Sequence, residues 1–491
     1  MKSTKLCTFL AALLLVMVLC STEKSEPPNI LFIMSDDHSK NAISCYGNSD
    51  INTPGIDRLA SEGILFEHAM TPNSFCTPSR AILLTGKYSH KNGTTHLNQQ
   101  FNGAQQTYPK LFQEAGYQTS IFGKWHLLTR PTGFDYYCVM KMQGAHYNPR
   151  VFEPTDEWIP WKNGSDDWNK GGRIIPGYSV DVITDEALKW IKNRDKNKPF
   201  CMLLHPKPPH APYEPAKRYE HFFDSINLPE PSTLFDDYHG RTPELLQDNM
   251  KNNRILLAQH FQKYLSQNDI NNLDDDQKLK KLFQSYMKDY YRLVKSVDDN
   301  ISKVLDFLED NDLAENTIVV YTSDNGFFLG EHGFYNKQWM YEPSIHVPLI
   351  IRYPKLIQKG EINSSLVNFT DIAPTLLDLA GLPVPDDMQG KSLKPILEGK
   401  KDKVHDAFYY HFYRHNNVLP EMVGARTERY KIICYPGLDD KYKWELFDLK
   451  EDINEMNNLY YNSNYSGLKI EMKSKLDSLI TEFEDTVILP D

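Results

Sequence analysis

Two short segments of the sequence end in side chains that bind hard metal ions. PNILFIMSDDH runs through apolar residues to Asp36 and Asp37, and NTIVVYTSDNG runs in the same way to Asp324 and Asn325. Each side chain alone is equally well explained by a helix cap or a turn. Four oxygen donors together suit Ca²⁺ or Mg²⁺ better than Zn²⁺, which prefers nitrogen and sulfur. The pattern therefore predicts a divalent metal site built from oxygen ligands.

Cationic and titratable side chains follow other apolar segments. Lys124 and His126 lie in GKWH, His210 lies in HPKPPHAP and Lys337 lies in GFYNKQWMYE. A lone histidine or loop lysine at such a place is more often structural than functional. Beside a hard metal, however, several cationic donors fit a tetrahedral oxyanion, whose outer oxygens all carry charge. The set favours a sulfate or phosphate ester as the substrate.

Cys76 opens the apolar, helix-like segment CTPSRAILLTG. Its thiol is core filler, half of a disulfide, a metal ligand or a nucleophile, and the residues alone leave these alternatives open. The chain has seven cysteines, of which Cys7 and Cys20 lie in the N-terminal leader. The remaining five cannot all pair with one another, so at least one thiol stays free.

The segment SFCTPSRAILLTG resembles the maturation signature of sulfatases, and SDDH, GKWH, PHAP, SDNGFFLGEHG and NKQWMYE resemble the sulfatase pattern in order and approximate spacing. The resemblance covers nearly the whole chain. It implies an alkaline-phosphatase-like fold and a dedicated maturation enzyme that oxidises Cys76 to formylglycine (3-oxoalanine). The hydrated aldehyde would then be the nucleophile.

The resemblance also implies a role for each residue of the site. The implied Ca²⁺ ligands are Asp36, Asp37, modified Cys76, Asp324 and Asn325. Arg80 would orient the hydrate, while Lys124 and Lys337 would bind sulfate oxygens. His210, also close to the substrate, would protonate the departing alcohol. His126 would remove a proton from the second hydroxyl, so that sulfate is expelled and the aldehyde returns.

The sequence indicates the identity of the substrate less precisely than the type of reaction. YTSDNGFFLGEHG and WELFDLKEDINEMNNLY are most similar to sulfatases that act on glycosaminoglycans. The leading expectation is an exo-acting enzyme for 6-O-sulfated N-acetylglucosamine. His411 and Arg414, in an expected loop over 408–422, either bind a sugar or line a domain junction. The alternatives are another sulfated sugar (GalNAc, galactose or uronate), a phosphodiesterase or phosphonate hydrolase of the same fold, and a non-catalytic sulfoglycan-binding lipoprotein.

The elements that must position these residues form an α/β pattern. The chain has 491 residues, of which 40% are hydrophobic and 24% charged, as in an ordinary globular protein. Short apolar runs alternate with helical patterns over 180–193 and 290–311. We expect a catalytic domain over 27–395 with a large mixed sheet flanked by helices. A smaller C-terminal α+β unit with an antiparallel sheet is expected over 400–491.

The first 20 residues predict a signal peptide, because Lys2 and Lys5 precede an apolar stretch too short to span a bilayer. Cys20 stands where a lipoprotein would be acylated, although Leu19 before it fits that site poorly. Plain cleavage and lipid anchoring both stay open, so the expected location is the periplasm or the outer membrane. The formal charge of −11 excludes a general nucleic-acid binder.

Overall fold

The computed structural model describes residues 26–490 except 163–164, 166–168, 246–253, 257–260, 262–263, 265–269, 271, 415–418 and 439–442. The expected signal peptide over 1–20, with Cys20, lies outside the described residues. Across the described ranges, no helix combines the length and the apolar character needed to cross a membrane.

An eight-stranded mixed sheet forms the centre of the molecule, with the strand order β12-β2-β11-β8-β1-β7-β3-β4. The strands are β1 (Asn29–Ser35), β2 (Ile64–Met70), β3 (Gln118–Lys124), β4 (Tyr136–Met140), β7 (Phe200–His205), β8 (Thr317–Ser323), β11 (His346–Arg352) and β12 (Glu361–Asn368). β11 runs antiparallel to both of its neighbours, whereas the other pairs are parallel. The large mixed sheet predicted from the sequence is confirmed.

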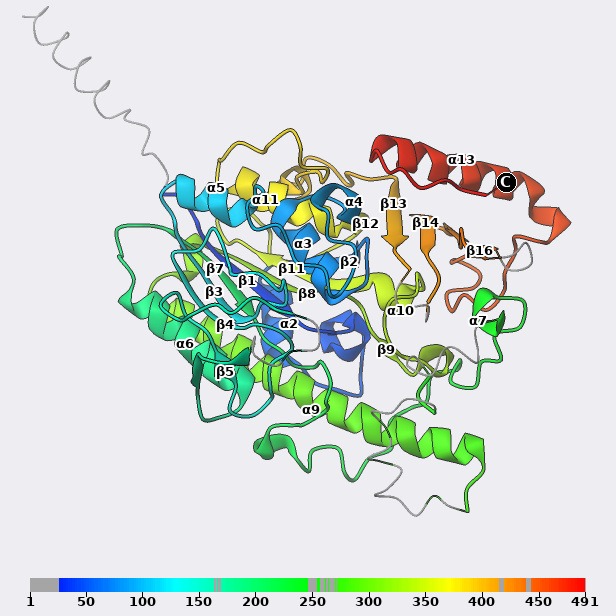
Figure 1. The fold of residues 1–491 in the computed structure, drawn as a ribbon, viewed down its shortest axis with the longest axis horizontal. Coiled ribbons are helices and arrows are strands. Elements are labelled where there is room, and N and C mark those ends of the chain that lie inside the picture. The colour runs from blue at the N-terminus through cyan, green and yellow to red at the C-terminus, as the bar shows by residue number, and fades with distance from the viewer. Residues whose placement is uncertain are drawn as a thin grey trace, which may run out of the picture.

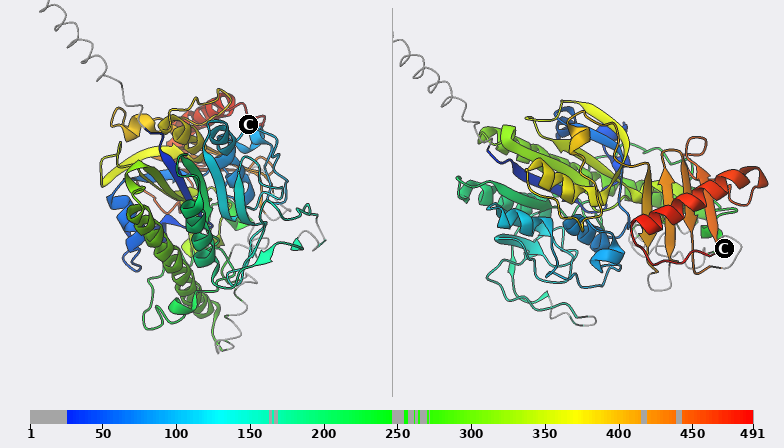
Figure 2. Two further views of the ribbon diagram at one scale, coloured as in Figure 1. Left: turned by 90° about the vertical axis from the view of Figure 1, so that its left-hand side faces the viewer. Right: turned by 90° about the horizontal axis from the view of Figure 1, so that it is seen from above.

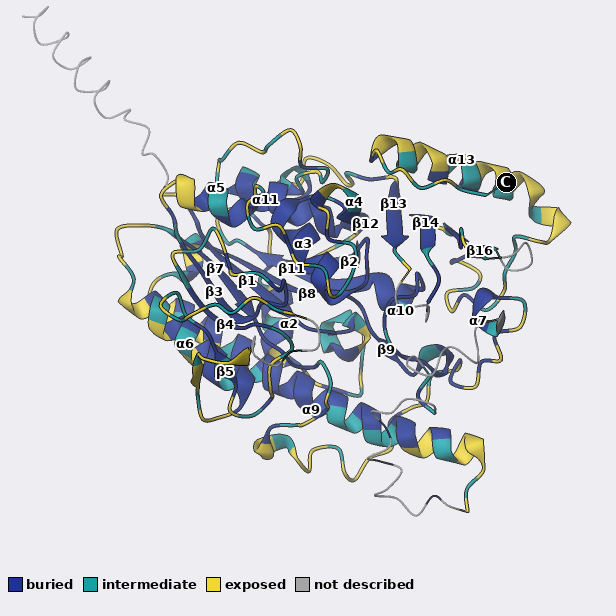
Figure 3. Cartoon of the chain, in the orientation of Figure 1, coloured by how far each residue is buried: buried dark blue, intermediate teal, exposed yellow. Residues whose placement is uncertain are grey.

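Helices cover both faces of this sheet (Figure 1). One face carries α3 (Cys76–Thr85), α5 (Tyr108–Glu114) and α11 (Ile372–Leu379), and the other carries α2 (Pro54–Ser61), α6 (Ser179–Asn193) and α9 (Asp275–Asp310). Alternate residues of β1 explain the arrangement: Phe32 packs with α3, and Ile33 packs with α9. A strand buried on both faces is apolar throughout, as β1 is. Figure 3 shows the resulting dark, buried centre.

The helix α9 is longer than the pattern over 290–311 predicts, because it already begins at Asp275. Asp274 accepts a hydrogen bond from the backbone of Gln277, whose side chain accepts one from the backbone of Asp274. This capping box fixes the start of the helix in a charged stretch where apolar periodicity is weak.

A second, four-stranded antiparallel sheet lies beside the first and is covered by the C-terminal helix α13 (Ser466–Glu482), coloured red in Figure 2. Its strands are β13 (Ala407–Phe412), β14 (Met422–Thr427), β15 (Tyr430–Cys434) and β16 (Trp444–Asp448). The smaller C-terminal α+β unit is thereby confirmed. The expected loop over 408–422 is wrong for its first part, since the aromatic run pairs with β14 as a strand.

Short elements connect these layers: α4 (Ser89–Asn92), β5 (Arg150–Val151), β6 (Arg173–Ile174), α7 (Thr242–Leu245), β9 (Phe328–Leu329), β10 (Tyr335–Asn336), α10 (Glu342–Ile345) and α12 (Lys394–Leu397). Because β1, β3, β7 and β8 are parallel, the residues that follow them gather at one edge of the sheet.

Candidate active site

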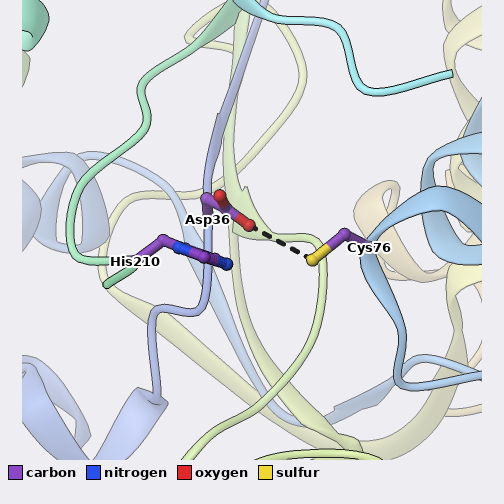
Figure 4. A group of neighbouring side chains, drawn as sticks. All are labelled: Asp36, Cys76 and His210. Carbon is purple, nitrogen blue, oxygen red and sulfur yellow. Dashed lines mark hydrogen bonds between the residues drawn. The ribbon is translucent and has the colours of Figure 1, made fainter. Parts of the chain in front are cut away.

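Three aspartates and Cys76 meet at that edge. Asp36 and Asp37 follow β1, Asp324 follows β8, and Cys76 is the first residue of α3. One ligand atom from each of these four buried residues lies within 4.8 Å of the others. Figure 4 shows Asp36 between Cys76 and His210, and the Cys76 Sγ lies 3.6 Å from the Asp36 Oδ1.

The oxygen atoms of this cluster fit a hard divalent cation. The amide Nδ2 of Asn325 donates to the Asp37 Oδ1 at 2.7 Å, while its Oδ1 is buried without a hydrogen-bond partner among the described residues. Burial, followed by the nearby Asp36 charge, raises the pKa of Asp324 to about 6. Ca²⁺ or Mg²⁺ would bind such closely spaced carboxylates and an amide oxygen that lacks a hydrogen-bond partner. The four predicted oxygen ligands are thus brought together.

Arg80 anchors the cluster from within α3. Its Nε donates to the Asp324 Oδ2 at 3.0 Å, and its Nη1 donates to the carbonyl of Lys124 at 2.9 Å. The Arg80 Nη2 also lies 3.8 Å from the Asp36 Oδ1. One buried guanidinium therefore links α3 to the ends of β1, β3 and β8, which fixes the relative positions of the metal ligands.

Two buried lysines reach the same carboxylates from other segments. Lys124, the last residue of β3, donates to Asp36, and Lys337, after β10, donates to Asp37. The Lys337 Nζ also lies 3.3 Å from the Cys76 Sγ. Burial alone would raise the pKa of Asp36, but Lys124 and further cations hold it well below its ordinary value. The site thus holds cations ready to bind anionic oxygens next to Cys76.

Cys76 itself is an uncharged thiol in this environment. Its side chain is 1% exposed, and burial raises its pKa to about 12 despite Lys124 and Lys337 nearby. The described cysteines, including Cys76, are all free. A buried neutral thiol is a poor nucleophile. Its position at the head of α3 therefore disfavours a thiolate.

The two predicted histidines also lie at the site. His126 is buried just after β3, and neither of its ring nitrogens has a hydrogen-bond partner among the described residues. The hydroxyl of Thr77 donates to the His126 carbonyl at 3.0 Å, which ties His126 to the start of α3. The His210 Nε2 lies 3.6 Å from the Asp37 Oδ2. Burial lowers the pKa of both histidines.

Three further side chains support these residues and were not predicted from the sequence. Gln143 accepts a hydrogen bond from Lys124 at 2.6 Å, and the His146 Nε2 donates to the carbonyl of His210 at 2.8 Å. Lys207 is fully buried in the loop between β7 and His210. Lys207 stands in the segment HPKPPHAP, in which only His210 was predicted to have a role. No sequence pattern marks Gln143 or His146.

His411 and Arg414 are placed differently from the core of the site. His411, in β13, is 4% exposed, and its two ring nitrogens contact the carboxylates of Asp485 and Glu421 at 2.7 and 2.8 Å. Arg414 is exposed beyond the end of that strand. No described contact joins either residue to the Cys76 cluster, and their role in substrate binding stays a prediction.

Two family models match the chain. The Sulfatase model matches residues 28–382, and the model for the C-terminal part of N-sulphoglucosamine sulphohydrolase matches residues 330–482. The first match contains every residue of the Cys76 cluster. It spans well over half of the chain.

Individual relatives agree with the family models. The N-acetylglucosamine-6-O-sulfatase of Bacteroides thetaiotaomicron is 40% identical over 94% of this chain and 88% of its own. An Ulvan-active sulfatase of Formosa agariphila is 26% identical over 91% and 79%. A solved structure in complex with its substrate D-glucosamine-2-N,6-O-disulfate has a TM-score of 0.84 and 38% identity, and the match covers 94% of this chain and 99% of the other. The chain therefore belongs to the sulfatase family and is a sulfuric ester hydrolase.

Proposed function

We propose that this enzyme removes the 6-O-sulfate from N-acetylglucosamine, or from the related glucosamine, at the end of a glycosaminoglycan-type sugar. The observation that carries the proposal is the Cys76 thiol held among three carboxylates and three buried cations. The sugar is inferred from the two similar proteins whose names specify a glucosamine sulfated at position 6.

The proposal includes formylglycine at position 76 and Ca²⁺ at the oxygen cluster. Once formed, hydrated formylglycine at position 76 would supply two hydroxyls, one as the nucleophile towards sulfur and one whose deprotonation would expel sulfate. When bound, Ca²⁺ would supply positive charge that makes a hydroxyl at position 76 more acidic. The residues that would hold the ion are Asp36, Asp37, Asp324, Asn325 and modified Cys76.

The remaining side chains have complementary tasks. Lys124 and Lys337 bind the outer sulfate oxygens and stabilise the charge that spreads over them, as their position beside Cys76 supports. Arg80 keeps the head of α3 in register with the metal ligands. His210, when it carries protons on both ring nitrogens, gives its Nε2 proton to the departing sugar oxygen and returns to the neutral Nδ1–H form. His126, with both ring nitrogens unpaired among the described residues, accepts a proton from position 76.

We further propose that the enzyme is exported by its N-terminal leader and acts in the periplasm, or at the outer membrane through a lipidated Cys20. The supporting observation is the charged and then apolar N-terminal sequence. Mass spectrometry of the N-terminal peptide from fractionated cells distinguishes a lipid-modified Cys20 from a plainly cleaved end.

A panel of sulfated sugars tests the proposed substrate. The panel contains 6-O-sulfated N-acetylglucosamine and glucosamine, 6-O-sulfated GalNAc and galactose, a 2-O-sulfated uronate, and a phosphonate monoester. We expect kcat/KM to be highest for the 6-O-sulfated glucosamines and lower by at least about tenfold for the 4-epimeric GalNAc and galactose esters, a difference equivalent to about 1.4 kcal/mol. A higher kcat/KM for any other ester would replace the proposed substrate.

A further inference from the structure

The loop that carries His210 contains a second buried, positively charged side chain. Lys207 lies three residues before His210, follows β7 directly and is 0% exposed. Its Nζ donates to the carbonyl of Ala211 at 2.9 Å. Within the described part of the chain, no carboxylate forms an ion pair with it. A buried ammonium with a backbone carbonyl as its hydrogen-bond partner is costly, so it needs a reason beyond packing.

The ring of His210 shares that carbonyl with Lys207. The His210 Nδ1 lies 2.6 Å from the Ala211 oxygen. A carbonyl oxygen can only accept hydrogen bonds, and its two lone pairs can serve two donors. The His210 Nδ1 must therefore carry a proton. The Nε2 is then the nitrogen that faces the reacting groups, 3.6 Å from the Asp37 Oδ2.

Hydrogen bonds and a β-bridge hold the other residues of this loop in place. The backbone N–H of His210 donates to the Lys207 carbonyl at 3.2 Å, and the His146 Nε2 donates to the His210 carbonyl at 2.8 Å. Pro209 forms a parallel bridge with Asp36, a residue of the oxygen cluster. The Ala211 carbonyl is the group of this loop that both Lys207 and the His210 ring contact.

We propose that Lys207 is a positioning residue for His210: its ammonium holds the Ala211 carbonyl where it accepts the Nδ1 proton, and so keeps the Nε2 directed at the leaving sugar oxygen. The inference rests on the proposed function, in which the His210 Nε2 protonates that oxygen. Lys207 acts through the imidazole and does not touch the substrate. Without the ammonium, the ring would also populate orientations in which the Nε2 is misplaced.

The test is a double-mutant cycle with Lys207→Met and His210→Ala on a sugar sulfate. We expect Lys207→Met alone to lower kcat by about tenfold, which is the worth of one hydrogen bond, with KM changed less than twofold. In the His210→Ala background the same change should cost less than about twofold, because there is no ring left to position. An equal loss in both backgrounds, or no loss in the presence of His210, would overturn the inference.

A control variant, a substitute variant and a second substrate accompany this cycle. Lys295→Met removes another buried lysine that donates to a backbone carbonyl, that of Asn52 at 2.7 Å, and should leave kcat unchanged. Lys207→Gln, which keeps a neutral donor, replaces Lys207→Met if the latter fails to fold. Lys207→Met should lower kcat less on an activated aryl sulfate than on the sugar sulfate. If His210→Ala costs the same on both esters, the proposed acid role fails, while the coupling in the cycle still reports whether Lys207 positions the ring.

Discussion

At the scale of single residues, Cys76 shows how burial decides what a side chain can do. Lys124 and Lys337 favour a thiolate, yet burial outweighs them and raises the pKa of Cys76 to about 12. A thiol whose pKa is raised in this way is a poor nucleophile. The aldehyde hydrate that we propose at position 76 would not need to be ionised beforehand, since its hydroxyl would lose a proton only as it attacks.

The first prediction therefore concerns Cys76. Cys76→Ala should abolish sulfate release, while the melting temperature of the chelated protein stays close to that of the chelated wild type, because the change at position 76 is small. Mass spectrometry of the peptide that contains residue 76 should show loss of sulfur in the active wild-type enzyme. Substantial turnover by Cys76→Ala would refute the proposed nucleophile.

The roles of His210 and His126 should be distinguishable by comparing esters with different leaving groups. A sugar alcohol needs a proton as it departs, whereas a nitrophenolate leaves almost unaided. His210→Ala should thus lower the rate on a sugar sulfate by about 10²-fold, and much less on an aryl sulfate. His126→Ala should slow both esters equally, because it acts after the alcohol has left. Single-turnover and steady-state rates of both variants check this, and equal losses for His210→Ala would remove its acid role.

At the scale of elements, the sequence predicts what depends on local pattern. The apolar runs before Asp36 and Asp324 predict buried strands, and the structure shows β1 and β8 as buried, parallel neighbours in the sheet. The antiparallel direction of β11 depends on β2, which lies far away in the chain, whereas the strand β13 depends on its pairing with the nearby β14. Lys207 was not predicted although its partner Ala211 is only four residues away, because the direction of a backbone carbonyl cannot be inferred from residue spacing.

The strand β13 offers a prediction on stability. Burial alone would lower the pKa of His411, but hydrogen bonds to Asp485 and Glu421 raise it above 6.5. The stabilisation by this charged histidine is therefore complete below pH 6.5 and is lost as the pH rises through the raised value. Asp485→Asn should lower the free energy of unfolding by about 2 kcal/mol near pH 6, and by less near pH 9.

Thermal unfolding between pH 5 and pH 9 provides the measurement. Glu484→Gln is the matched control, because Glu484 is the neighbouring carboxylate but lies exposed at the surface. It should change the melting temperature little at any pH. A destabilisation by Asp485→Asn that stays constant over the whole range would assign the effect to packing and not to the charge on His411.

At the scale of the whole molecule, the oxygen cluster joins parts of the chain that meet only after folding. Asp37 precedes Asp324 by 287 positions, yet the backbone N–H of Asp37 donates to the Asp324 Oδ1 at 3.2 Å. Helix α3 reaches the same place from one face of the sheet, and Lys337 reaches it from a loop beyond β10. A metal ion bound there stabilises the folded chain in particular, because the unfolded chain has no such site.

The last prediction follows from this linkage. Removal of Ca²⁺ by chelation should lower both the melting temperature and the activity, and Ca²⁺ should restore both better than Zn²⁺, because the donors are oxygens. At a free Ca²⁺ concentration 100 times the dissociation constant, the gain in stability should be about 2.7 kcal/mol. Asp324→Asn should keep its fold and lose most of this response, since the variant lacks one ligand charge. Differential scanning calorimetry and turnover, measured on the same chelated samples with each ion added back, check the two effects together.

If an exhaustively chelated enzyme kept its full melting temperature and activity, the metal assignment would be wrong. If Zn²⁺ restored activity as well as Ca²⁺, the site would hold a metal, but its selectivity would not come from hard oxygen ligands.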